Sequence, residues 1–132
     1  MGKTLGWIIG IVAFVFLVML ILPSEITGFA VFSGSGEHDL FASELAESGV
    51  KMYGAYWCSH CAEQKKIFGS SWGEFKDKGY IECSLPNAAG QTDECNVAGI
   101  KSYPTWEFAD GSRISGVMPL EQLSVVTGIS LE

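Results

Sequence analysis

Two cysteines separated by a Ser-His pair, Cys58 and Cys61, are the residues of this chain best suited to chemistry. They follow an apolar, aromatic segment over residues 50–57 and begin a segment with helical character. A helix N-terminus offers free backbone N–H groups and the positive end of the helix dipole, which stabilise a thiolate. Two thiols at this spacing can also close a disulfide with each other. The pattern therefore predicts thiol–disulfide exchange.

Each residue around this pair has a predicted role. Cys58, at the helix start, is the predicted nucleophile, and Cys61, one turn further in, is predicted to resolve the mixed disulfide. His60 is predicted to stabilise the Cys58 thiolate, which favours the reduced pair and makes its disulfide a better oxidant. The alternative is that His60 is an exposed helix residue without such a role. Trp57 is predicted to shield the disulfide and to help form a docking surface, with a core or strand-end position as the alternative.

The chain contains four cysteines, which allow three pairings. The simplest joins Cys58 to Cys61 and leaves Cys83 with Cys95. A structural Cys83–Cys95 disulfide would close a loop of about a dozen residues and contribute about 3 kcal/mol in the chain-entropy model. The alternative is a second redox pair that relays electrons from Cys58 and Cys61.

A structural zinc site in an adaptor domain would be another use of the four cysteines. It needs four sulfurs about 2.3 Å from one ion, and Cys83 and Cys95 lack the close spacing typical of zinc ribbons. None of the four methionines suggests copper ligation. The favoured interpretation has no metal and no cofactor other than the redox-active Cys58–Cys61 disulfide.

Alternating helix and strand patterns follow residue 36. The predicted elements are a helix around residues 40–46, a strand over 50–57, a helix over 58–76 interrupted near 69–71, a strand over 80–84, a helix over 92–98 with Thr92 as N-cap, a hairpin of strands 105–109 and 113–117, and a helix over 119–127. The expected inward-facing residues include Ala62, Ile67, Phe68, Trp72, Phe75, Trp106, Phe108, Leu120, Leu123 and Val126. This order predicts an α/β domain, a four-stranded mixed sheet flanked by helices.

An uncharged apolar segment, residues 5–22, precedes this domain. At about 1.5 Å per residue it covers about 27 Å, close to the hydrocarbon thickness of a bilayer. We therefore expect a transmembrane signal anchor over residues 1–22, a linker over 23–36 and a folded domain over 37–132. The alternative is a cleaved signal peptide with its site at Gly28-Phe29-Ala30.

The charge distribution sets the expected orientation. Lys3 precedes the apolar segment, whereas all fifteen acidic residues and the other seven basic ones follow it. This places the domain on the extracytoplasmic side of the cell membrane, with a single membrane pass. An acidic domain also disfavours nucleic acid and anionic lipid surfaces as partners.

Two segments together resemble the thioredoxin fold: A-Y-W-C-S-H-C at residues 55–61 and S-Y-P-T at residues 102–105. Residues 53–61 and 98–106, with Glu82-Cys83 and Glu94-Cys95, more closely resemble the thioredoxin-like domain associated with bacterial and plant homologues of vitamin K epoxide reductase (VKOR). In those proteins the domain passes electrons from folding substrates to a quinone-reducing membrane partner.

The resemblance implies that Pro104 is cis and lies beside the cysteine pair. The backbone of Tyr103 would then bind an extended substrate segment, so the predicted substrate-binding residues are Trp57, Tyr103 and Pro104. One departure concerns Met52, since thioredoxins and oxidising Dsb-type relatives carry a buried acidic residue at that position to help proton transfer. Either Glu82 on the neighbouring strand substitutes for it, or proton transfer relies on His60 and water.

These features predict a membrane-anchored, extracytoplasmic thiol–disulfide oxidoreductase that oxidises or isomerises cysteines in exported proteins. Its expected partner is a VKOR/DsbB-like, quinone-linked membrane protein that reoxidises it. One alternative is an anchored thioredoxin-like reductant, for example in cytochrome maturation. The resemblance favours oxidation, because a histidine next to the resolving cysteine accompanies oxidising potentials in the relatives. A further alternative is a structural disulfide domain that docks onto a partner.

Overall fold

The computed structural model describes Phe14 and residues 36–131. The chain divides into two units, residues 1–33 and 34–132, and the architecture below is that of the second unit. The expected anchor over residues 1–22, apart from Phe14, and the expected linker up to residue 35 lie outside the described residues. Within the described part of the chain, no helix is long and apolar enough to cross a membrane.

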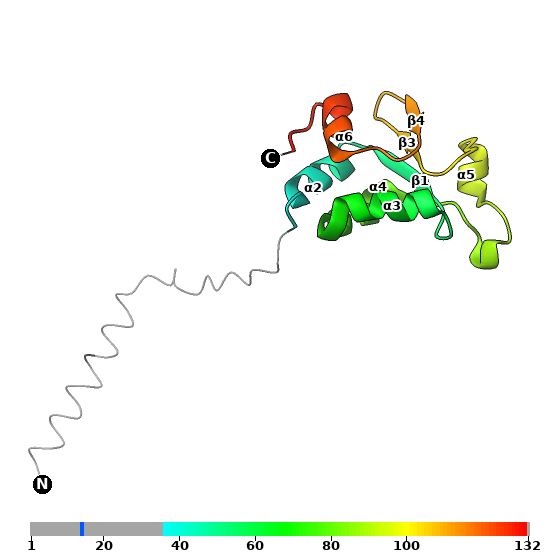
Figure 1. Cartoon of the computed structure of the whole chain (residues 1–132), viewed down its shortest axis with the longest axis horizontal. Coiled ribbons are helices and arrows are strands. Elements are labelled where there is room, and N and C mark those ends of the chain that lie inside the picture. Colours follow the sequence, from blue (N-terminus) through cyan, green and yellow to red (C-terminus); the bar gives the residue numbers. More distant parts are fainter. Residues whose placement is uncertain (1–13, 15–35, 132) are drawn as a thin grey trace, which may run out of the picture. The chain divides into compact units, whose positions relative to one another are not determined.

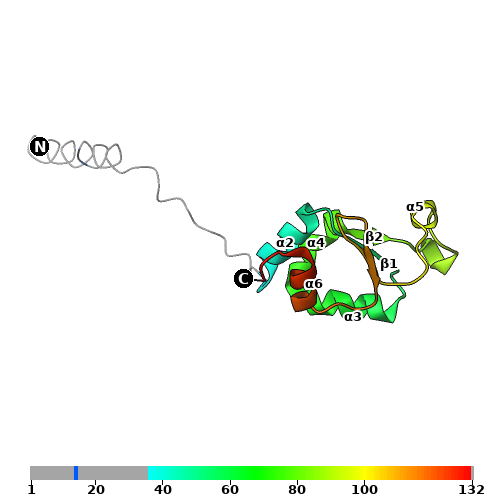
Figure 2. The ribbon, with the colours of Figure 1, turned by 90° about the horizontal axis from the view of Figure 1, so that it is seen from above.

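Short helices and strands alternate through the domain. They are α2 (Asp39–Glu47), β1 (Lys51–Gly54), α3 (Ser59–Phe68), the 3₁₀ helix η2 (Gly69–Ser71), α4 (Trp72–Gly79), β2 (Tyr80–Glu82), the 3₁₀ helix η3 (Pro86–Ala88), α5 (Asp93–Val97), β3 (Thr105–Glu107), β4 (Arg113–Ser115) and α6 (Leu120–Thr127). Helices α5 and α6 lie at opposite ends of the domain (Figures 1 and 2).

The four strands form one mixed sheet in the order β2-β1-β3-β4. Strand β1 is parallel to β2 and antiparallel to β3, and β3 is antiparallel to β4. The predicted four-stranded mixed sheet with helices is therefore confirmed. Since β1 has a neighbour on each side, the position of the segment after Gly54, which leads to the cysteines, is set by the centre of the sheet.

Aromatic side chains hold α3 and α4 to the sheet. The ring of Phe68 stacks on those of Phe75 and Trp106, with centroids 5.5 Å and 6.3 Å away. All three side chains are buried, and Trp72 packs at the edge of the cluster. Aromatic pairs of this kind contribute beyond the buried area alone, and this cluster holds the C-terminal end of α3 against α4 and the sheet.

The predicted interruption of the long helix near residues 69–71 is confirmed. Helix α3 ends before Gly69, whose φ of 58° lies in the left-handed region that glycine adopts without strain. A single turn of 3₁₀ helix, η2, then leads into α4. The change of direction lets Phe68 and Phe75, from different helices, reach the same cluster.

Several predicted boundaries and inward positions were wrong. The strand predicted over 50–57 ends at Gly54, and the other strands are also shorter than predicted. Ala62 is exposed, because it lies roughly 130° around α3 from the buried face that Cys61, Gln64 and Phe68 define. Val126 is 45% exposed, since it lies roughly 90° from the midpoint of the buried Leu120 and Leu123.

The expected N-cap of the helix after residue 92 is only partly present. Thr92 occupies the N-cap position of α5, but its side chain makes no capping hydrogen bond. Acidic residues fill the first turn instead, where they interact favourably with the helix dipole.

Gln64 is a buried polar residue that links α3 to the segment before α6. Its Nε2 donates to the carbonyl of Met118 at 2.8 Å, and the Met118 N–H donates to its Oε1 at 2.7 Å. One side chain thus satisfies both backbone groups of a buried residue 54 positions away. Buried backbone groups need such partners, so Gln64 fixes the approach of the C-terminal helix.

We expect Gln64→Leu to lower the free energy of unfolding by about 2–4 kcal/mol, because it leaves a buried N–H and a buried carbonyl without partners. Urea unfolding of the oxidised protein measures the change. Gln122→Leu, on the exposed face of α6, is the matched control and should change stability by less than about 0.5 kcal/mol. Equal effects of the two variants would contradict the role assigned to Gln64.

Candidate active site

The cysteine pair begins α3 directly after a tight turn from the sheet. The N–H of Cys58 donates to the carbonyl of Ala55 at 3.0 Å, which closes this turn. Cys58 is the N-cap residue of α3, and its sulfur accepts the N–H of Cys61 at 3.3 Å. A helix N-terminus with an N–H aimed at the sulfur suits a negatively charged sulfur.

The two thiols differ in access to solvent. Both are free in the structure; Cys58 is 8% exposed, whereas Cys61 is fully buried. Burial raises the pKa of the Cys61 thiol to about 12, and its hydrogen bond with Cys58 adds to this shift. Only Cys58 is therefore open to a substrate disulfide, while Cys61 is placed to act after it.

The segment around Pro104 lies against Cys58. The Tyr103–Pro104 peptide bond is cis, as the resemblance predicts. The Cys58 sulfur lies 3.6 Å from the carbonyl oxygen of Tyr103, to which its thiol donates a hydrogen bond. Pro104 is buried and Tyr103 is half-buried. Residues about forty-five positions apart thus meet at one sulfur.

Trp57 lies at the surface beside the cysteines. Trp57 is 55% exposed, so the alternative of a core position is wrong. The indole N–H donates to Ser84 Oγ at 2.8 Å, and the ring meets that of Tyr103 edge-on at 5.9 Å. Tyr56 and Leu85 are also exposed, and we call Tyr56, Trp57 and Leu85 the apolar rim.

His60 lies in the first turn of α3 and is exposed. Within residues 36–131 its imidazole has no hydrogen-bond or ion-pair partner. His60 therefore lies between the two cysteines in the sequence, and its side chain lies on the solvent side of the helix.

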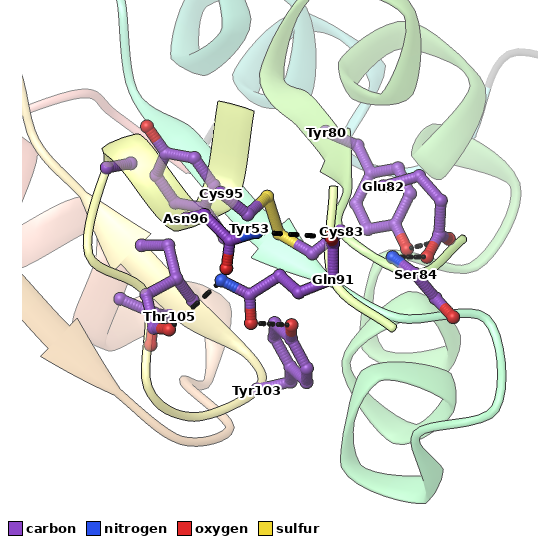
Figure 3. Close-up of a disulfide and its surroundings, with 12 residues drawn as sticks. Tyr53, Tyr80, Glu82, Cys83, Ser84, Gln91, Cys95, Asn96, Tyr103 and Thr105 are labelled. Carbon is purple, nitrogen blue, oxygen red and sulfur yellow. Dashed lines mark hydrogen bonds between the residues drawn. A yellow bond between two sulfur atoms is a disulfide. The ribbon is translucent and has the colours of Figure 1, made fainter. Parts of the chain in front are cut away.

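Behind the cysteines, Glu82 is held by three donors. Its Oε1 accepts the N–H of Tyr56 at 3.1 Å. Its Oε1 also accepts the N–H of Ser84 at 2.9 Å, and its Oε2 accepts the Tyr80 hydroxyl at 2.7 Å (Figure 3). Met52, where the resemblance to thioredoxins leads us to expect an acid, is fully buried. Sequence reasoning named Glu82 but missed Tyr80. The signal was the strand spacing, because residues two apart point to the same side of a sheet.

The expected pairing of Cys83 with Cys95 is present as a disulfide between fully buried residues. This bond removes both sulfurs from any four-cysteine zinc site, so that alternative is wrong. Among residues 36–131, no group of three or more His, Cys, Asp and Glu side chains is placed to hold a metal ion.

The disulfide-bridged loop also supports Tyr103. Gln91, inside this loop, accepts the Tyr103 hydroxyl at 2.6 Å and donates to the carbonyl of Ile100 at 3.2 Å (Figure 3). The loop is tied back by the Thr92 N–H, which donates to the carbonyl of Cys83 at 2.8 Å. Gln91 is a second site residue that sequence reasoning missed, because no motif marks a glutamine in a loop.

The mixed sheet, its helices and the cysteine pair that begins α3 beside a cis-proline fit a thioredoxin-like fold. No family model matches the chain. It is similar to the thiol-disulfide oxidoreductase LTO1 of Arabidopsis thaliana, with 40% identity over 95 residues. The match covers 69% of this chain but only 24% of the plant protein.

The burial difference predicts unequal alkylation of the two thiols. In the folded, reduced protein near neutral pH, we expect iodoacetamide to modify Cys58 and to leave Cys61 largely unmodified, because thiolates react and the pKa of Cys61 is raised to about 12. Modification of Cys61 should rise roughly tenfold per pH unit from about pH 8 to about pH 11. Mass spectrometry of digested samples locates each label.

Protein unfolded in urea is the control for this experiment, and both thiols should react there at similar rates. Equal rates for Cys58 and Cys61 in the folded protein would contradict the assignment of Cys61 as the buried partner.

Proposed function

We propose that this protein is a membrane-anchored, extracytoplasmic thiol–disulfide oxidoreductase that oxidises or isomerises cysteines in exported proteins. The observation that carries the proposal is the position of Cys58. Its sulfur lies at the N-terminus of α3, receives the N–H of Cys61, and faces the carbonyl before cis-Pro104. The similarity to a plant thiol-disulfide oxidoreductase supports the same chemistry.

The oxidising reaction begins with the Cys58–Cys61 disulfide. A substrate thiolate attacks the Cys58 sulfur, the Cys58–Cys61 bond breaks, and Cys61 leaves as a thiolate that takes up a proton. A second substrate thiolate attacks the substrate sulfur of the mixed disulfide, and Cys58 leaves. The substrate loses two electrons and the cysteine pair gains them.

Reoxidation reverses the roles of donor and acceptor. The Cys58 thiolate attacks a disulfide of the partner, then Cys61 loses its proton and attacks the Cys58 sulfur. The partner's thiols leave with the two electrons. We propose that this partner is a VKOR/DsbB-like, quinone-linked membrane protein, and that residues 1–22 hold the domain at the same membrane. The apolar segment over 5–22 and the sequence resemblance support both points.

The substrate would lie across cis-Pro104 with the apolar rim beside it. The rim presents exposed aromatic and aliphatic surface next to Cys58, and such surface is available to apolar segments of incompletely folded chains. The polar hydroxyl of Ser84 holds the Trp57 ring in place. His60 would lie beside the mixed disulfide as it forms.

The direction of electron flow is tested by redox titration of the full chain in glutathione buffers, with thiols alkylated and located by mass spectrometry. For an oxidising enzyme we expect a Cys58–Cys61 midpoint of about −120 to −180 mV, with Cys83–Cys95 remaining oxidised throughout. A midpoint near −270 mV, the thioredoxin value, would instead favour the reductant. Titration of Cys83 and Cys95 in the same range would overturn their structural role.

The order of attack is tested with cysteine variants. We expect Cys61→Ser to accumulate mixed disulfides through Cys58, because the resolving thiol is missing, and Cys58→Ser to form none. Non-reducing gels after acid trapping in membranes measure both, and the trapped proteins identify substrates and the membrane partner. Cys58→Ser with undiminished exchange activity would rule out the proposed function.

A further inference from the structure

The proposed function requires proton transfer to and from Cys61, and no residue has so far been assigned to it. In each cycle Cys61 leaves as a thiolate and is protonated, then loses a proton before it attacks. Its sulfur is fully buried, and burial raises the pKa of its thiol to about 12. Met52, which is fully buried, offers no acid or base for this transfer. The following inference rests on the proposed function and supplies the missing proton path.

The absence of a side chain at Gly54 lets the Tyr80 hydroxyl lie near Cys61. Gly54, the last residue of β1, has no side chain, and a Cβ at this position would lie 3.1 Å from the Tyr80 hydroxyl and 3.2 Å from the Cys61 sulfur. The hydroxyl and the sulfur therefore face the same small space. Their separation is at most the sum of these two distances, and no direct hydrogen bond joins them, so proton transfer between them takes one bridging water.

The other side of the Tyr80 hydroxyl is already engaged. It donates to Glu82 Oε2 at 2.7 Å (Figure 3). Glu82 is fixed in turn by the backbone N–H groups of Tyr56 and Ser84. The Tyr80 ring packs edge-on against Trp72 at 5.4 Å. The hydroxyl is thus held between a buried thiol and a carboxylate that is half-buried.

We propose that the Tyr80 hydroxyl carries the proton between the Cys61 sulfur and the Glu82 carboxylate. When Cys61 attacks, its S–H bond breaks, the bridging water takes that proton and passes one of its own to the Tyr80 oxygen, and the original hydroxyl proton passes to Glu82. When Cys61 leaves as a thiolate, each transfer runs in reverse. No electron is exchanged in these steps, and Glu82 acts through Tyr80 as a positioning residue and proton store.

The charged and titratable groups around Tyr80 fit this role. Lys65, one turn after Cys61 on α3, places its ammonium 4.2 Å from the centre of the Tyr80 ring. Burial raises the pKa of Cys61, and the charge of Lys65 offsets a small part of this rise. Burial and the bond to Glu82 raise the pKa of Tyr80, with Cys61 and Cys58 adding to the shift, so it remains a phenol. Tyr103, across the site, also remains protonated, since burial and then Glu82 raise its pKa.

The test separates the two thiol steps in one reaction. The full chain in detergent, with Cys58 and Cys61 reduced, is mixed with excess Ellman's reagent, and the released thionitrobenzoate is followed by stopped flow. The first release reports attack by Cys58, and the second reports resolution by Cys61. We expect Tyr80→Phe, which keeps the ring, to slow the second release at least about tenfold and to leave the first within about twofold.

Two further variants sharpen the result. Glu82→Gln retains hydrogen-bonding atoms but stores no proton, so we expect it to slow the second release as well and to leave the first release within about twofold. Tyr53→Phe is the matched control, because this buried tyrosine on β1 donates to Glu107 and packs in the cluster of Cys83 and Cys95, not in that of Cys58 and Cys61. It should leave both releases unchanged.

Two outcomes would overturn the inference. One is a second release in Tyr80→Phe that matches the wild-type rate and pH profile, and the other is equal slowing of both releases, which indicates general disruption. Absence of the first release from the wild-type protein is a different result, since it would reject the proposed function itself.

Discussion

The pairing of β1 with β2 on one side and β3 on the other determines the rest of the site. In this register Gly54 lies opposite Glu82, and Tyr53 lies opposite Thr105, the residue after cis-Pro104. The chain that leaves β1 turns at once into the cysteine pair. Three segments therefore meet at one end of the sheet. They are the segment with the two thiols, strand β2 with the Glu82 carboxylate, and the segment with cis-Pro104. A shift of one residue in the pairing of β1 with β2 would turn the Glu82 side chain to the opposite face, away from the cysteine pair.

The same arrangement gives two chemically identical side chains different properties. Cys58 is the N-cap residue of α3 and keeps some exposure to solvent. The N–H of Cys61 and the carbonyl of Tyr103 face its sulfur. Cys61, one turn later, points into a closed space lined by the end of β1. The difference arises from depth, because Cys58 is the N-cap residue at the start of α3, whereas Cys61 lies within the first turn and packs against the end of β1. No additional group is needed to set the order in which the two sulfurs react.

Much of this architecture could be predicted from the sequence because it depends on local patterns. The cysteine spacing, the Gly69 break and the hairpin at Asp110-Gly111 are signals within a few residues. The cis form of Pro104 could not come from composition and was available only through resemblance. Gln64, Gln91 and Tyr80 were missed for a common reason. Each acts through a partner set by tertiary folding, and a polar side chain does not indicate in sequence whether it will find Met118, Tyr103 or a thiol.

The Cys83–Cys95 disulfide has a consequence for the maturation of the protein. Each new chain emerges with four thiols, yet the structure has one bond between two of them, in a fully buried position that lies outside the proposed catalytic exchange. Maturation thus includes an oxidation that turnover does not repeat. A protein proposed to form disulfides in other proteins therefore needs a disulfide to be formed in itself before it is mature.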